Sequence, residues 1–109
     1  MVREGFYKVE FHTAHGTGNG VIHAISGKLR GGNFGFAFIG NYADGADGIH
    51  VKMSTQRHND DPAIRCLLGP DMITLTMKGT EDGDMVDFEG TALQLPGVLL
   101  KAVLTRICD

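Results

Sequence analysis

The side chains of this chain that could do chemistry are histidines, a cysteine beside an arginine, and two groups of carboxylates. Neither the His-x-x-x-His nor the Cys-x-x-Cys spacing of a zinc site occurs, and zinc needs three or four ligands that converge. His12 and His15 could meet at one strand end, but scattered surface histidines are the stronger interpretation, and no metal site is expected. The five histidines are His12, His15, His23, His50 and His58.

No catalytic or cofactor site emerges from the remaining motifs. Cys66 follows Arg65, a cation that would activate the thiol, yet a lone cysteine in an apolar stretch is more often a small buried side chain. Gly16, Gly18 and Gly20 have the spacing of a phosphate loop, but a dinucleotide fingerprint needs a helix to follow it. A strand is predicted there instead, which favours a flexible hairpin. Because no nucleophile, base and orienting group can be assembled, we expect a binding protein and not an enzyme, with no cofactor.

Carboxylates gather in two glycine-containing segments. Asp44 and Asp47 flank one of them, and Glu81, Asp82 and Asp84 make up the densest acidic patch of the chain. The second segment has the composition of a hairpin turn, and its spacing does not match a calcium-binding loop. A solvated turn is the default interpretation of the second segment, and as the densest acidic patch it is also a possible contact surface for a partner protein.

The elements that must position these groups are predicted to be strands. Apolar and polar residues alternate in short stretches cut apart by glycine-rich turns, which is typical of a β-sandwich or β-barrel. We expect a single all-β domain over residues 1–109, an eight-stranded up-and-down barrel whose last strand pairs with its first. The segment 64–68 is either a short strand or one helical turn. The predicted strands are 6–12, 20–25, 34–40, 49–54, 64–68, 73–78, 85–90 and 98–107.

Composition narrows the possible partners. The net charge is −3 and the 10 basic residues are scattered, which argues against direct nucleic-acid binding. The longest apolar run, 95–100, is too short to span a bilayer, so no membrane association is expected. With two cysteines and no signal peptide, the chain is expected to be cytoplasmic with reduced thiols.

Several short motifs resemble those of the GrlR family, small bacterial negative regulators of type III secretion gene expression. They are Gly5-Phe6-Tyr7-Lys8-Val9-Glu10-Phe11, Gly20-Val21, Gly27-Lys28 with Gly31-Gly32, and Gly40-Asn41-Tyr42. The resemblance covers the first half of the chain well and the rest by strand spacing.

The resemblance implies a lipocalin-like barrel with an apolar interior. It also implies a homodimer that sequesters a transcriptional activator in the cytoplasm. In the family's best-known member, a loop after the third strand carries four consecutive acidic residues that matter for repression. The corresponding stretch here, 42–48, keeps only Asp44 and Asp47, so the acidic block is diluted.

Two apolar features leave alternatives open. Phe34, Phe36 and Phe38 would fill the core if they face inward, or would form, with Val103, an exposed surface suited to a dimer if they face outward. The barrel interior could instead hold a small lipid-like ligand, which is the alternative function. Its lining would be Tyr7, Val9, Phe11, Val51, Met53, Leu75, Met77 and Phe88.

Overall fold

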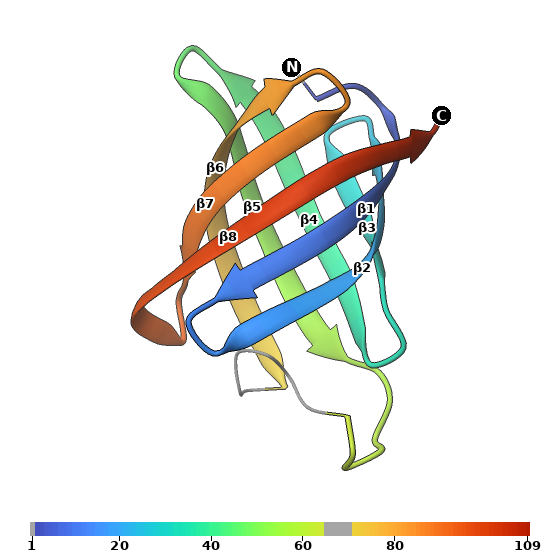
Figure 1. The fold of residues 1–109 in the computed structure, drawn as a ribbon, viewed down its shortest axis with the longest axis vertical. Coiled ribbons are helices and arrows are strands. Elements are labelled where there is room, and N and C mark those ends of the chain that lie inside the picture. The colour runs from blue at the N-terminus through green and yellow to red at the C-terminus, as the bar shows by residue number, and fades with distance from the viewer. Residues whose placement is uncertain (1, 65–70) are drawn as a thin grey trace.

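Eight antiparallel strands form a closed barrel in this computed structural model, which describes residues 2–64 and 71–109. Each strand pairs with the next in sequence, and β1 also pairs with β8, which confirms the predicted up-and-down barrel (Figure 1). The strands are β1 (Gly5–Thr13), β2 (Gly16–Ile25), β3 (Lys28–Gly32), β4 (Phe36–Gly45), β5 (Gly48–Arg57), β6 (Met72–Asp82), β7 (Met85–Ala92) and β8 (Leu95–Cys108).

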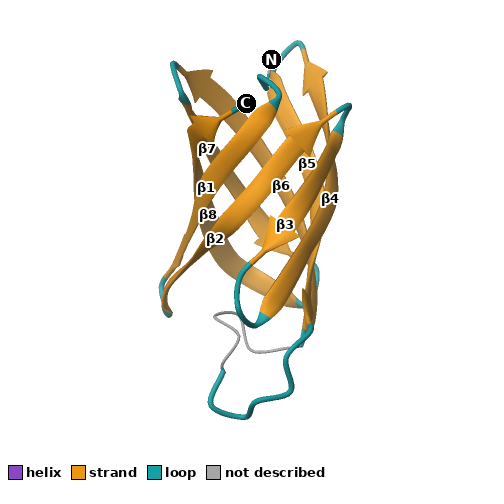
Figure 2. Ribbon diagram, turned by 90° about the vertical axis from the view of Figure 1, so that its right-hand side faces the viewer, coloured by secondary structure: helices purple, strands orange, loops and turns teal. Residues whose placement is uncertain are grey.

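This topology gives the barrel two different ends. Connections between consecutive strands alternate between the ends, so the turns β2–β3, β4–β5 and β6–β7 lie together with both chain termini. We call this the terminal end. The far end carries the other four connections, including the one between β5 and β6, whose described residues 58–64 extend away from the barrel (Figure 2).

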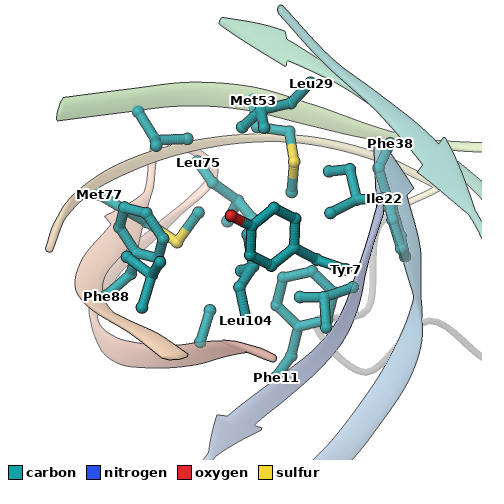
Figure 3. Close-up of a cluster of buried hydrophobic side chains, with 14 of the residues drawn as sticks. Tyr7, Phe11, Ile22, Leu29, Phe38, Met53, Leu75, Met77, Phe88 and Leu104 are labelled. Atoms are coloured by element: carbon teal, nitrogen blue, oxygen red, sulfur yellow. The ribbon is translucent and has the colours of Figure 1, made fainter. Parts of the chain in front are cut away.

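Strand alternation fills the interior. On β6, Ile73, Leu75 and Met77 face inward and are buried, while the residues between them face out, as a period of two requires. Side chains from all around the wall meet at the centre (Figure 3). There the rings of Phe11 and Phe38 pack edge to face, with centroids 5.3 Å apart.

The number of strands was predicted correctly, but one of them was wrongly located. Lys28–Gly32, expected to be part of two turns, forms β3 and pairs with both β2 and β4. Glycine content suggested turns there, whereas in a closed wall glycine also serves where neighbouring strands approach closely. Strands β5 and β6 pair directly with each other. Ile64 lies outside any strand, and residues 65–68 are outside the described residues.

The glycine-rich segment at 16–20 is also strand and not a hairpin loop, because the turn before β2 lies at residues 14–15. Gly20 is required by packing across the wall. A Cβ atom at Gly20 would lie 2.6 Å from the ring of Phe38 and 2.7 Å from the carbonyl oxygen of Gly32. Glycine therefore makes room for a large core side chain.

Of the two alternatives for the three phenylalanines, the inward one holds for Phe36 and Phe38, so they do not form an exposed dimer surface. Both are buried in the core, and Ala37 between them faces outward. Phe34 precedes β4 in the far-end loop and is 74% exposed. Val103 faces outward on β8 and is half-buried, with Glu10 and Asp87 as its neighbours across the strands.

Candidate functional site

The barrel interior is filled by its own side chains. All eight residues predicted to line a ligand cavity are buried and face inward, but the cavity that six of them line, without Tyr7 and Leu75, is only about 10 Å³. That volume suits about one water molecule, whereas sites for small ligands span roughly 300–1,000 Å³. A lipid-like ligand would enter only if core side chains moved.

The acidic segments lie at the terminal end. Asp44 and Asp47 belong to the β4–β5 hairpin, and Glu81, Asp82 and Asp84 to the β6–β7 hairpin, both of which close at the end that carries the termini (Figure 1). The two segments were predicted as separate candidate contact surfaces. The fold places both at the same end of the molecule.

An open pocket of about 870 Å³ lies at this end. Asp44 is the one predicted contact residue in its lining, and the others belong to the N-terminal segment, the β2–β3 turn, β4 and the end of β8. The lining residues are Val2, Arg3, Glu4, Gly27, Tyr42, Asp44, Arg106 and Asp109.

Arg106 reaches the pocket because it continues the inward register of β8 beyond Leu104. Its side chain is 14% exposed, and one terminal nitrogen donates hydrogen bonds to the carbonyl oxygen of Glu4, at 3.2 Å, and to the carboxylate of Asp109. This pairing raises the pKa of Arg106 and lowers the pKa of Asp109. The buried Nε has no acceptor among the described residues.

A glycine makes the position of Arg106 possible. A Cβ atom at Gly5 would lie 2.7 Å from the carbonyl oxygen of Cys108 and 3.0 Å from the Nε of Arg106. Gly5 also has a φ of 155°, which side chains disfavour. The absence of a side chain at Gly5 therefore leaves room for the guanidinium of Arg106.

The N-terminal segment forms one wall of the pocket through three polar contacts. Arg3 pairs with Asp84 at 3.0 Å, and the hydroxyl of Tyr7 donates to the carbonyl oxygen of Arg3. A carboxylate oxygen of Glu4 accepts the backbone N–H of Ser26 at 2.7 Å. Burial raises the pKa of Tyr7, so its hydroxyl remains a donor well into the alkaline range.

Asp47 has a different role from Asp44. Its carboxylate accepts hydrogen bonds from Nζ of Lys78, at 2.9 Å, and Nε2 of His50, at 2.8 Å. These two donors hold the pKa of Asp47 well below its usual range. Asp47 thus fastens the β4–β5 hairpin to β6, while Asp44 lines the pocket.

Sequence reasoning missed the residues that complete the pocket. Arg3 and Glu4 precede the first predicted strand, and Arg106 lies within the last one, 98–107, where it was not identified as a site residue. The signal for Arg106 was present in the period-two pattern, since Ala102, Leu104 and Arg106 share one face of β8.

The other candidate groups do not gather into a site. Within residues 2–64 and 71–109, no three histidine, cysteine or carboxylate side chains are grouped so that they could hold a metal ion. Cys66 lies outside the described residues, and Cys108 is exposed. The described part of the chain has no helix long and apolar enough to cross a membrane.

Comparison with known proteins adds no family assignment. No protein-family model matches the chain, and no curated protein matches it.

Proposed function

We propose that this protein is a cytoplasmic regulator that binds a partner protein through the terminal end of its barrel. The observation that carries the proposal is the grouping of two acidic hairpins and an open charged pocket at one end of a barrel with a filled interior. The resemblance to the GrlR family extends the proposal to negative regulation of type III secretion genes, by sequestering a transcriptional activator.

Electrostatics favours a basic partner. Carboxylates from the N-terminal segment and from both hairpins make the electrostatic potential at the terminal end more negative. A negative potential attracts positively charged surfaces and speeds their association. DNA-binding activators carry clustered lysine and arginine for contact with phosphates. Occupying that cluster with carboxylates would keep the activator from DNA.

Affinity capture from the cells that make this protein, followed by binding measurements with the purified partner, tests the proposal. Asp44→Asn/Asp82→Asn should weaken binding about fivefold or more, because two charges are removed at the proposed interface. Asp60→Asn/Asp61→Asn removes the same charge at the far end and should leave binding unchanged. Equal losses in both variants, or none in either, would argue against the terminal end.

The oligomeric state is a separate expectation. The resemblance implies a homodimer. Of the residues predicted to form the dimer surface, Val103 is the one that faces outward from the barrel wall. Sedimentation velocity should give a dimeric mass for wild type and a monomeric one for Val103→Glu. A monomeric wild type would remove dimerisation from the proposal.

A further inference from the structure

The lysines on the outer wall of the barrel fall into two groups. On β1, β6 and β8, each outward-facing lysine forms an ion pair. The pairs are Lys8 with Glu10 at 3.0 Å, Lys78 with Asp47 at 2.9 Å and Lys101 with Glu89 at 3.5 Å. Lys28 on β3 and Lys52 on β5 are also exposed, but neither has a carboxylate partner within the part of the chain that the structure describes. Their charges are therefore uncompensated.

A third cation lies beside them. Arg30 faces outward two residues after Lys28, and its Nη1 donates hydrogen bonds to the carbonyl oxygens of Leu29, at 2.8 Å, and Gly40, at 2.7 Å. Both acceptors are neutral, so the guanidinium keeps its positive charge. These two bonds hold the side chain against the wall, which reduces the entropy that it would lose on binding an anion.

The pairing register brings the three cations together, because β3, β4 and β5 lie side by side (Figure 2). Lys28 and Lys52 lie opposite Asn41 of β4, one on each side of it, and Arg30 lies opposite Ile39. From a strand spacing of about 4.8 Å, the Cα atoms of the two lysines are roughly 10 Å apart. About three residues of an extended chain span that distance. We call the surface formed by Lys28, Arg30, Ile39, Asn41 and Lys52 the basic face.

Carboxylates are confined to one margin of this wall. Strands β2, β3 and β5 contain no aspartate or glutamate, and β4 has only Asp44, which lines the pocket at the terminal end. Two other carboxylates at that margin already accept hydrogen bonds, Glu4 from the Ser26 N–H and Asp47 from Lys78. The basic face therefore presents positive charge without an internal counterion.

The basic face also has an aliphatic component. Ile39 lies within it and is 39% exposed, and Ile25, opposite Lys28 on β2, is 44% exposed. The outward-facing residues of β2–β5 include no aromatic ring on which a nucleic-acid base could stack. Since the chain also has a net charge of −3, this combination suits an acidic polypeptide better than a nucleic acid.

We propose that the basic face binds an acidic segment of a partner protein, one that carries aliphatic side chains among its carboxylates. Lys28, Arg30 and Lys52 bind the carboxylates, and the side-chain amide of Asn41 supplies a further donor between the lysines. Ile25 and Ile39 contact the aliphatic side chains. The inference does not depend on the proposed function, because it concerns another surface and a segment of opposite charge.

The direct test titrates two short peptides into ¹⁵N-labelled wild-type protein. The acidic peptide, acetyl-Glu-Leu-Glu-Glu-Leu-Glu-amide, should cause saturable shifts of the backbone amides of Arg30, Ile39, Asn41 and Lys52. The same peptide with glutamine in place of each glutamate keeps the shape without the charge, and should bind at least about tenfold more weakly. Equal shifts with both peptides, or no shifts at these amides, would overturn the proposal.

Two other occupants are distinguished by the same amides. Tighter binding of a single-stranded oligothymidylate with the same number of charges would assign the basic face to nucleic acid. Shifts that grow with protein concentration in the absence of peptide, with a dimeric mass in sedimentation velocity, would assign it to a second copy of this chain. Either result would contradict an acidic segment as the occupant.

Matched variants locate the peptide. Lys28→Gln/Lys52→Gln should weaken binding of the acidic peptide at least about fivefold, because two uncompensated charges are removed. Lys8→Gln/Lys101→Gln removes the same charge from exposed, ion-paired lysines of β1 and β8, and should bind the peptide like wild type. Circular dichroism should show that both variants fold, since all four side chains are exposed. Equal losses in the two variants would reveal attraction by overall charge and would sink the proposal.

Discussion

The barrel interior and the pocket at the terminal end share strands β4 and β8, yet they differ in free volume and in the chemistry of their lining. The interior leaves about 10 Å³ unfilled among apolar side chains, whereas the pocket opens about 870 Å³ among charged ones. On β4 the inward register runs from Phe38 to Tyr42 and Asp44, and on β8 it runs from Leu104 to Arg106. The open pocket therefore begins where the inward-facing side chains of these strands change from apolar to charged.

This difference implies a division of roles. Inward residues near the middle of the strands should determine stability, and inward residues at the strand ends should determine binding. Four substitutions test how stability is distributed between the two regions.

The largest effect is expected in the interior. Phe38→Ala removes a buried ring that packs on Phe11, which should cost about 3–5 kcal/mol of unfolding free energy. Phe34→Ala removes the same side chain from an exposed far-end loop and should change stability by no more than about 0.5 kcal/mol. Urea denaturation measures both, and similar costs would contradict the inward orientation of Phe38.

A wall glycine should come next. Gly20→Ala places a methyl group against the ring of Phe38 and the backbone of Gly32, which should cost about 2 kcal/mol. Gly83 has nothing within 4 Å of a Cβ position and a φ of 63°, which asparagine tolerates. Gly83→Asn should therefore be nearly neutral in the same denaturation experiment.

Tyr7 lies at the boundary between the two regions. Tyr7→Phe should cost about 1 kcal/mol, because the carbonyl oxygen of Arg3 loses its donor. Hydrogen exchange should increase at Arg3 and Glu4 and stay unchanged at Leu75. Since burial raises the pKa of Tyr7 above 10.0, wild type should lose stability as the pH rises above that value, and Tyr7→Phe should lack this loss.

The smallest effect is expected at an exposed ion pair. The pKa of Asp47 is lower in the folded protein than its ordinary value of 3.8, so its ionised form stabilises the fold above that pH. The difference in melting temperature between wild type and Asp47→Asn should shrink as the pH falls below 3.8. Lys78→Gln should remove most of this difference, and 1 M salt should screen it. A difference that persists in strong acid would assign Asp47 another role.

Period-two alternation was sufficient to predict an all-β fold, and most of its strands. It placed Val9, Val51 and Leu75 on the inward face correctly, because one face of a strand must avoid water in a chain of this size. It failed at β3, where Leu29 is the one buried residue and the strand ends in two glycines, Gly31 and Gly32. A strand whose neighbours supply the core side chains carries little signal of its own.

The pocket was less predictable than the barrel. Asp44 was identified as a possible contact residue, but Glu4 and Arg106 lie about a hundred residues apart and meet only because β1 pairs with β8. The separate roles of Asp44 and Asp47 depend on Lys78, which belongs to another strand. Such contacts between distant residues arise because the barrel closes. The residue pattern of a single strand does not predict which strands will pair.

The pairing of β1 with β8 has a further consequence for how any partner is recognised. An open sheet offers a row of unsatisfied amides and carbonyls at its margin, to which an extended peptide can add as one more strand. Each of the eight described strands has a neighbour on both sides, and only short stretches, such as 16–20 of β2 and 95–100 of β8, pair on one side alone. Recognition should then come chiefly from side chains and turns, so partner specificity should depend on individual substitutions more than on generic backbone complementarity.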